Sequence, residues 1–553
     1  MPDDLFGDRV PRAARKKTAR RTVESDLRTI SQRITDVARF DDLYRLAVVL
    51  AQAPGPRRGR PPHYPPYVYL LFLALRGIHG SARYCAGDLQ DPSVWNTIRS
   101  GVARHLGTDE AARLPDSGPS RHQWQHAQRT LLVPRLEELG ETFADLALAQ
   151  ALRQGLLPAG ARRSWSSPQR HQLIAGDGTV AKSPTLSTTP YSVDPITGEI
   201  RRHRVDPASS WQKEGGADRA DNDTPGTAAA TKSFEGNGKN EGEGEDAMVL
   251  GTKFVVFSTR HRGYFRRVFL RYAHVPHNHP GGEAAVALDL ACAILDAAEG
   301  CMGVLYDGAL RGMHRDVIAR RGRLLINKQH KGASPRYIRN LDFGRCRHEL
   351  WSNRGRVHVR AFLDDGTSAL IPLSVDKLER RASTHTHRWY HLLTVPCPRG
   401  PHQHRESVGV TTTAGERDAG QSDTETGFHR AEHLLQIPDN TATHQTLYGG
   451  REDTEAGFSQ LDRSLWNRRM IAFGAEAQSL VILGFLLAQN ATSAARYQED
   501  PTYSDTVTAG LSSDRREPSR SRTEPRRPPH PSPIRYPVWD RRSRRSAPLP
   551  KSG

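Results

Sequence analysis

The amino-acid sequence predicts an α/β fold whose sheet lies between a helical N-terminal region and a basic tail without regular structure. Three observations predict it. Apolar residues recur at helical spacing from residue 24 to about 155. The pattern then changes to strand, strand, strand, helix, strand, helix and strand up to residue 328. The last stretch, 499–553, is rich in Arg, Pro and Ser, so we expect it to be disordered.

The chain of 553 residues is longer than one hydrophobic core usually fills, so two or three packed units are expected. Residues 1–23 combine several basic side chains with few apolar ones and predict a flexible arm that can lie along phosphates. Residues 24–155 predict a helical domain, for which a plain helical bundle is the alternative to DNA binding. DNA binding is favoured by three arginines beside a proline-rich break, Arg57, Arg58 and Arg60.

The middle of the chain predicts a second domain, from 165 to 498. Its elements are strands at 171–177, 252–258, 264–272, 302–306 and 323–328, and helices at 283–298 and 313–320. Residues 206–246 are rich in Gly, Asp, Glu, Asn and Ala, so we expect a disordered insertion there. A β-rich insertion is expected at about 345–440, before helices from Arg451 to about Tyr497.

The charge of the chain indicates a polyanionic partner. The formal net charge is +18 and the sequence pI is about 9.9, and cationic side chains gain affinity for nucleic acid by releasing counterions from phosphates. No stretch is long and apolar enough for a membrane helix or a secretory leader. The five cysteines are scattered, which favours a reducing compartment. We therefore expect the protein in the cytoplasm or nucleoid, with no membrane association.

Two aspartates stand where carboxylates would meet. Asp177 and Asp307 each follow an apolar strand and precede a glycine, although either one alone is an ordinary strand-end residue. A third acidic motif, Tyr448-Gly-Gly-Arg451-Glu-Asp-Thr-Glu455, begins a helix and puts Arg451 and Glu455 on one face. Carboxylates that converge on two cations about 4 Å apart are what two-metal phosphoryl transfer requires.

With these motifs the chain resembles bacterial insertion-sequence transposases of the DDE type, in the branch marked by Tyr-x2-Arg-x3-Glu-x6-Lys. Tyr448, Arg451 and Glu455 match by spacing, and the place of the Lys is taken by Asp462 followed by Arg463. The resemblance implies a ribonuclease-H-like core. It also implies that Asp177, Asp307 and Glu455 are the catalytic carboxylates that hold two Mg²⁺ or Mn²⁺ ions, and that Tyr448, Arg451 and Arg463 contact DNA.

The activity implied by the resemblance is cleavage of transposon ends and their joining to target DNA. Water attacks the phosphate at the end of the element, and the freed 3′-hydroxyl then attacks the target. The implied partners are terminal inverted repeats, target DNA and a second copy of the chain. Two alternatives remain: a catalytically inactive DNA-binding protein derived from a transposase, and a metal-dependent nuclease without strand transfer.

For the remaining candidate groups we favour a structural explanation over a functional one. Glu452 and Asp453 compete with Glu455 but are favoured as helix N-terminal acids. The glycine-rich stretch 236–244 lacks the Lys-Ser/Thr of a P-loop, so no nucleotide cofactor is expected. A histidine-rich polar loop is favoured over a zinc site for a group whose spacing fits no zinc template, namely His385, His387, His391, Cys397, His402 and His404.

Overall fold

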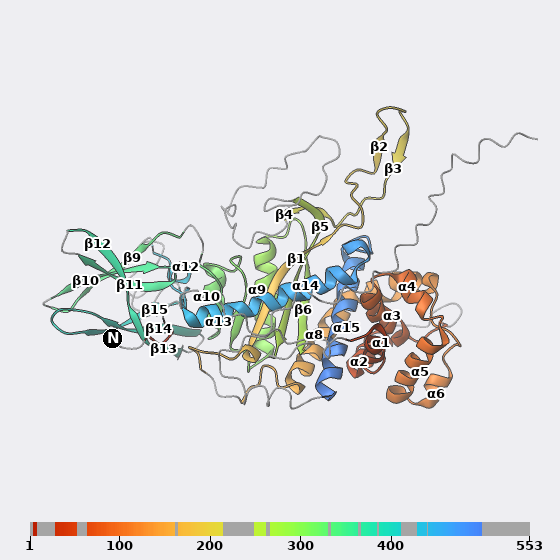
Figure 1. Ribbon diagram of the computed structural model, residues 1–553, viewed down its shortest axis with the longest axis horizontal. Helices are drawn as coiled ribbons and strands as arrows, with labels where there is room; N and C mark the ends of the chain where they lie inside the picture. Colours follow the sequence, from red (N-terminus) through yellow and green to blue (C-terminus); the bar gives the residue numbers. More distant parts are fainter. Residues whose placement is uncertain are drawn as a thin grey trace, which may run out of the picture.

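A computed structural model of the chain describes residues 4–7, 28–51, 63–160, 164–213, 248–261, 266–329, 333–344, 346–362, 366–383, 386–410, 428–439 and 441–499. It has an α/β fold built around a mixed sheet (Figure 1). The sheet occupies the middle of the molecule, the N-terminal helices lie at one end and a β-rich region lies at the other. Arg57, Arg58, Arg60 and the tail after Glu499 fall outside the described residues, so the predictions made for them are not tested.

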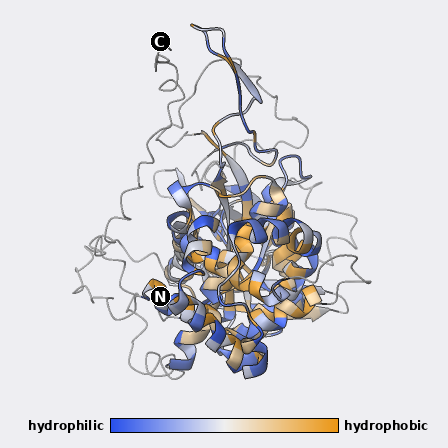
Figure 2. Cartoon of the chain, turned by 90° about the vertical axis from the view of Figure 1, so that its right-hand side faces the viewer, coloured by the Kyte–Doolittle hydropathy of each residue, from blue (hydrophilic) through white to orange (hydrophobic). Residues whose placement is uncertain are grey.

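The N-terminal region is helical, as its apolar periodicity predicts. Its α-helices are α1 (Ile30–Ala38), α2 (Asp41–Ala51), α3 (Pro66–His79), α4 (Ala82–Asp88), α5 (Pro92–Leu106), α6 (Thr108–Ala112), α7 (Arg121–Ala127) and α8 (Leu136–Arg153). Thr29 starts α1 with a capping box that it forms with Gln32. Seen end-on, these helices carry both hydrophobic and hydrophilic stretches (Figure 2), whereas α3 is buried almost all round.

The last helix, α15 (Ala475–Glu499), joins the helical region to the sheet, because it packs on α1, α3 and α8 as well as on the edge strand β6 (Arg267–Val275). It crosses α3 closely at two glycines. A Cβ on Gly77 would lie 2.7 Å from the Cα of Phe485, and one on Gly484 would lie 2.3 Å from the carbonyl oxygen of Leu73. The helical region therefore shares one continuous core with the sheet.

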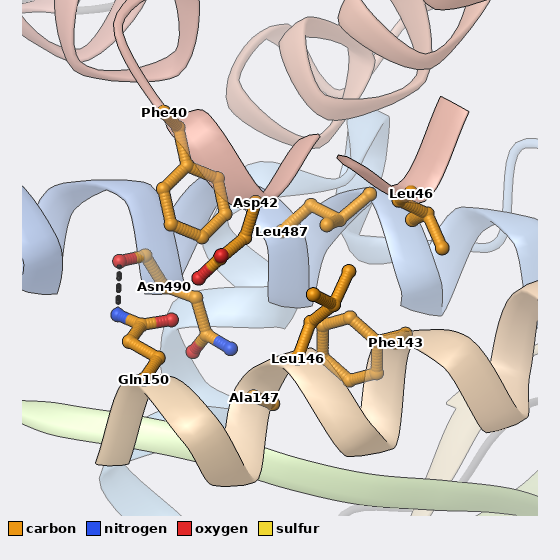
Figure 3. Close-up of a pocket in the computed structure, with 9 residues that line it drawn as sticks. All are labelled: Phe40, Asp42, Leu46, Phe143, Leu146, Ala147, Gln150, Leu487 and Asn490. Atoms are coloured by element: carbon orange, nitrogen blue, oxygen red, sulfur yellow. Dashed lines mark hydrogen bonds between the residues drawn. The ribbon is translucent and has the colours of Figure 1, made fainter. Parts of the chain in front are cut away.

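A polar contact fixes α15 on the edge of the sheet. The side chain of Asn490 accepts a hydrogen bond from the backbone N–H of Phe269 and donates one to its carbonyl oxygen, both at 2.9 Å. Gln150 of α8 donates to the backbone carbonyl of Asn490 at 2.9 Å (Figure 3). The pocket between α2, α8 and α15 in this view has a volume of about 10 Å³, room for about one water molecule and not for a substrate.

The central sheet has the order β4-β5-β1-β7-β8, with β6 paired to the same edge of β5 as β4. Its strands are β1 (Leu173–Lys182), β4 (Ser210–Lys213), β5 (Met248–Arg260), β6, β7 (Gly303–Leu305) and β8 (Leu324–Ile326). Strands β1, β7 and β8 are parallel, while β5 is antiparallel to β1 and to β6. The helices α9 (Gly282–Ala297) and α10 (Met313–Arg320) connect β6 to β7 and β7 to β8, in the predicted order.

The expected disordered insertion at 206–246 is wrong at its start. Residues 210–213 form β4 on the edge of β5, and Asp206 is buried, where it accepts hydrogen bonds from the N–H of Gly474 and the side chain of Gln478, each at 2.7 Å. The polar composition of this segment gives no sign that the buried carboxylate of Asp206 holds it in place. Before it, β2 (Tyr191–Val193) and β3 (Ile200–Arg202) form an exposed hairpin that projects from the sheet, and residues 214–247 lie outside the described residues.

The β-rich insertion begins earlier than residue 345, at β9, and its strands form two sheets. One is β12-β11-β10-β9 and the other is β13-β14-β15. The strands are β9 (Arg336–Asp342), β10 (Arg347–Asn353), β11 (Arg356–Phe362), β12 (Ser368–Pro372), β13 (Ser374–Ser383), β14 (Thr386–Val395) and β15 (His402–Val408). Apolar residues of both sheets share a core with the ends of β1, β7 and β8.

The N-terminal arm is also not flexible throughout. Phe6 is 2% exposed in the core of the β-rich insertion, Asp4 forms an ion pair with Arg356, and the N–H of Leu5 donates to the carbonyl of Val375 at 2.8 Å. One buried aromatic ring thus anchors residues 4–7, which lie beside β13 and β14 (Figure 1). Residues 8–27, which hold the basic side chains of the arm, lie outside the described residues.

The chain returns from the insertion to the sheet through helices. These are α12 (Arg430–His433), α13 (Ala442–Tyr448), a 3-10 turn at Gly449–Arg451, and α14 (Glu452–Ser464), which packs on β1. A short 3-10 turn at Trp466–Arg468 separates α14 from α15. Among the described helices, none is long and apolar enough to cross a membrane.

Candidate metal centre

Two neighbouring strands bring Asp177 and Asp307 together. In the parallel pairing of β1 with β7, Ala175 lies opposite Leu305. Asp177 follows two residues later within β1, which continues to Lys182 instead of ending at the aspartate as expected, and Asp307 lies two residues beyond the end of β7. Apolar alternation builds this arrangement, because Leu173 and Ala175 face one core and Ile174 faces the other. The sequence prediction that these two strands are adjacent is confirmed by the register.

A glutamate that the sequence interpretation did not select completes the group. Asp177, Glu283 and Asp307 each offer a carboxylate oxygen, and these atoms all lie within 4.8 Å of one another. Glu283 stands in the first turn of α9. Its carboxylate accepts a hydrogen bond from the Tyr306 hydroxyl at 2.9 Å and pairs with the Lys253 ammonium at 3.0 Å. Both contacts orient it toward the two aspartates.

The backbone leaves room for that glutamate at Gly178. A Cβ on Gly178 would lie 2.4–2.7 Å from the carboxylate atoms of Glu283, closer than any real contact allows. The glycine next to the first aspartate therefore has a second consequence besides ending an apolar run. It opens the space in which a carboxylate from α9 approaches β1.

Arg451 lies across the group from the side of α14. Its guanidinium donates to Asp177 at 3.1 Å through Nη1 and to Glu455 at 2.6 Å through Nη2. The spacing of four residues predicts the second contact, which follows helical geometry. Glu455 is 53% exposed and is not one of the three clustered acids, so its place as third metal ligand stays a prediction.

The electrostatics of the group favour an additional cation. Burial, followed by the charges of Asp307, Glu283 and Glu455, raises the pKa of Asp177 to about 7 despite the nearby Arg451. Burial and Glu283 also raise the pKa of Asp307, which an N–H of Ala309 at 2.9 Å lowers only in part. Four carboxylates, Asp177, Glu283, Asp307 and Glu455, are thus matched by two paired cations, Arg451 and Lys253.

The donor set fits hard divalent ions. Carboxylate oxygens are the ligands that Mg²⁺ and Mn²⁺ prefer, and the group contains no sulfur or imidazole donor within the described residues. Buried acids with raised pKa values bind such an ion in competition with protons. Asp177, Asp307 and Glu283 are therefore able to hold a divalent cation.

Further predicted DNA-contacting side chains lie around this centre. Tyr448 stacks on His444 with ring centroids 5.4 Å apart, and two cations approach its ring, Lys328 at 5.2 Å and Arg451 at 5.8 Å. Arg463 is exposed in the last turn of α14, and the first part of the same helix carries Glu455. Arg451 thus contacts the carboxylates directly, and Tyr448 lies beside Arg451.

One feature of the sequence points to Glu283, which is an acid directly after Gly281-Gly282 at the start of a predicted helix. That signal is weak, because acids at helix N-termini are common for reasons of the helix dipole alone. Glu283 differs from other such acids only in its place in the fold, because the first turn of α9 lies beside Gly178 of β1. The chain matches no protein-family model, no curated protein and no solved structure in the comparisons made.

Proposed function

We propose that this protein is a DNA transposase of the DDE type, which cleaves transposon ends and joins them to target DNA with the help of Mg²⁺ or Mn²⁺. The observation that carries the proposal is the convergence of Asp177 and Asp307 from adjacent parallel strands, with Arg451 of the Tyr448 motif bridging Asp177 and Glu455. The net charge of +18 supports a nucleic-acid substrate.

The order of the strands supports a ribonuclease-H-like core. Three strands, β1, β5 and β6, are antiparallel neighbours in the order β6-β5-β1, and β7 and β8 add parallel to β1 on its other side. In this sheet β1 and β7 are neighbours, and their acids lie just beyond the residues through which the two strands pair. We propose that the described sheet is this core, with the β-rich insertion between β8 and α14.

The residues of the centre divide into ligands and positioning groups. Asp177 and Asp307 would hold the metal, with the third carboxylate supplied by Glu283 or Glu455. Bound divalent ions would supply electrostatic stabilisation to the phosphoryl group and lower the pKa of an attacking water. Lys253 and the Tyr306 hydroxyl orient Glu283.

Arg451 is the group that would bind a DNA phosphate. Its guanidinium donates through two nitrogens to two different carboxylates, those of Asp177 and Glu455, and the same two nitrogens could donate to two oxygens of one phosphate. Tyr448 and Lys328 lie beside it and extend the cationic side of the centre. Arg463, which lies further along α14, would contact the DNA backbone. Two ends cut together would require two copies of the chain, and we propose a homodimer acting on DNA in the cytoplasm or nucleoid.

The experiment that tests the function uses the full chain with labelled DNA that carries the ends flanking its gene. Mg²⁺ or Mn²⁺ and an unlabelled target plasmid are included, and products are resolved as cleaved ends and as joined molecules. We expect cleavage at the ends followed by joining, both abolished by EDTA. Scrambled ends serve as the control.

Each other result identifies a different class of protein. Cleavage of the ends without any joined product would indicate a metal-dependent nuclease. Binding of the ends without cleavage, in either metal, would indicate a DNA-binding protein derived from a transposase. Neither binding nor cleavage of the flanking ends would contradict the proposal altogether.

A further inference from the structure

The β-rich insertion carries a second cluster of side chains that can bind a metal. Its members are cysteines and histidines instead of carboxylates, and they come from a different part of the sequence. Each of its two sheets contributes one hairpin turn. Cys346 ends the turn between β9 and β10, and His348 follows on β10. Cys397 lies in the turn between β14 and β15, and His402 is the first residue of β15. One Cys and one His thus come from each sheet.

The four side chains converge on one point. Each offers one ligand atom, a cysteine Sγ or an imidazole nitrogen, and these atoms all lie within 4.8 Å of one another. The Sγ of Cys346 is 3.0 Å from Nε2 of His402. Bonds of 2.0–2.3 Å in a tetrahedron put the ligand atoms about 3.3–3.8 Å apart, so a small inward movement would complete a zinc site.

The surroundings hold the four ligands in place. The ring of Phe343 stacks on His402 with centroids 4.1 Å apart and planes within 8°, which fixes the orientation of that imidazole. The turns are closed by hydrogen bonds of 3.0 Å, from the N–H of Phe343 to the carbonyl of Cys346 and from the N–H of Gly400 to that of Cys397. All four ligand residues are half-buried.

One buried atom points to a missing partner. Nε2 of His348 is shielded from solvent and has no hydrogen-bond partner among the described residues. An unpaired buried imidazole nitrogen is costly in a folded protein, and coordination of a metal is one of the few ways to satisfy it. The two thiols are free and are not joined in a disulfide.

We propose that Cys346, His348, Cys397 and His402 bind one structural Zn²⁺ that ties the two sheets of the β-rich insertion together. Two thiolates and two imidazoles form a closed donor set of the kind that structural zinc uses, with no position left for a substrate. The site differs from the carboxylate centre in donor type, so the two would select different metals. Zinc here is independent of whether the protein is a transposase.

This site could not be found from spacing alone. The sequence interpretation looked for zinc in the histidines and the one cysteine between 385 and 404, and preferred a polar loop. In the structure His391 is buried with its Nε2 2.9 Å from the carbonyl of Gln436, and His404 pairs with Glu406 at 3.0 Å, so neither joins the cluster. The other two ligands, Cys346 and His348, precede Cys397 by more than 45 residues.

The test is the zinc content of the full chain, purified in a reducing buffer without chelator and measured by elemental mass spectrometry. We expect about one zinc per chain in the wild type. A Cys346→Ser/Cys397→Ser double variant should retain less than a tenth of that. The matched controls are Cys292→Ser, a thiol on α9 outside the insertion, His122→Ala, an exposed imidazole on α7, and Asp177→Asn, and all three should keep their zinc.

A second measurement does not depend on the variants' folding. Wild-type protein is stripped of metal and titrated with Co²⁺, and we expect the visible absorption bands of tetrahedral cobalt together with a thiolate charge-transfer band, both removed by added Zn²⁺. Zinc-free wild type that also fails to give this spectrum would overturn the proposal. So would zinc that is lost with Asp177→Asn but kept by the double cysteine variant, or a Cys346–Cys397 disulfide in the reduced preparation.

Discussion

Replacing Asp177 by Asn should stabilise the metal-free protein at pH 8. Burial and the neighbouring acids raise the pKa of Asp177 from an ordinary value of 3.8 to about 7. Because the folded pKa is the higher one, the folded protein holds a proton between about pH 4 and 7 that the unfolded chain releases. Stability contributed by this proton is present at low pH and is lost as the pH rises through about 7.

The size of the effect follows from the shift. About three pKa units at roughly 1.36 kcal/mol each give an upper limit of about 4 kcal/mol for the ionised Asp177. Asn resembles the protonated acid at all pH values, and the shift already includes the ion pair with Arg451, so we expect a gain of roughly 1–3 kcal/mol at pH 8 and about a third of that at pH 5.

The assay is thermal unfolding followed by circular dichroism, in EDTA at pH 5 and pH 8 and again with Mg²⁺ at pH 8. The Asp177→Asn variant should melt roughly 2–6 °C above the wild type at pH 8 in EDTA. Added Mg²⁺ should raise the midpoint of the wild type and leave that of the variant unchanged. A variant that melts below the wild type at pH 8 in EDTA would show that the ionised Asp177 does not destabilise the folded protein.

The matched control is Asp206→Asn. This buried aspartate accepts hydrogen bonds from the N–H of Gly474 and the side-chain amide of Gln478, and an amide nitrogen in its place would meet a donor. We expect a loss of roughly 1–3 kcal/mol, opposite in sign to the change at Asp177. Equal effects of the two substitutions would show that the site has no special electrostatics.

Four further substitutions test the carboxylate centre and the contact of α15 with the sheet. Gly178→Ala should displace the carboxylate of Glu283 and weaken cleavage and Mg²⁺ binding, with little loss of stability because the clash is with the end of a side chain. Glu455→Gln should abolish Mg²⁺-dependent cleavage, because we propose Glu455 as the third catalytic carboxylate, whereas Glu283→Gln should only raise the Mg²⁺ concentration needed, because Asp177 and Asp307 remain as ligands. Asn490→Ala should destabilise the protein by roughly 2–4 kcal/mol, because it leaves a backbone N–H and carbonyl of β6 unpaired.

A control variant or a contradicting result accompanies each of these substitutions. Gly140→Ala, in α8 with open space around its Cβ, is the control for Gly178→Ala and should gain stability of about 1 kcal/mol without changing cleavage. If Glu283→Gln abolishes cleavage and Glu455→Gln does not, the third carboxylate is Glu283. An Asn490→Ala variant with an unchanged unfolding midpoint in denaturant would show that α15 does not depend on its contact with the edge strand.

The elements of the sheet were predictable because each has a local signature. Apolar runs of four to eight residues mark β1 and β5, and helical periodicity marks α9 and α10. The two aspartates were predictable because each follows a short apolar run, which places Asp307 just beyond the end of β7, whereas β1 continues past Asp177 to Lys182. Their approach then follows from the parallel pairing of β1 with β7.

The parts that escaped prediction depend on contacts between distant segments. Glu283 joins the carboxylates only because α9 returns to Gly178, and Phe6 anchors the N-terminus only because the β-rich insertion offers it a core. Cys346 and His402 lie 3.0 Å apart in space but 56 positions apart in sequence. Local periodicity carries no information about such pairs, and a single sequence offers no other source.

The most direct test of the central claim, that these carboxylates catalyse metal-dependent DNA cleavage, compares the wild type with Asp307→Asn on labelled end DNA. Binding is measured by gel shift in Ca²⁺ and cleavage in Mg²⁺ and Mn²⁺. We expect the variant to bind the DNA as the wild type does and to cleave it at least about 100-fold more slowly, since loss of a metal ligand removes several kcal/mol of transition-state stabilisation. Cleavage by Asp307→Asn at the wild-type rate would contradict the account.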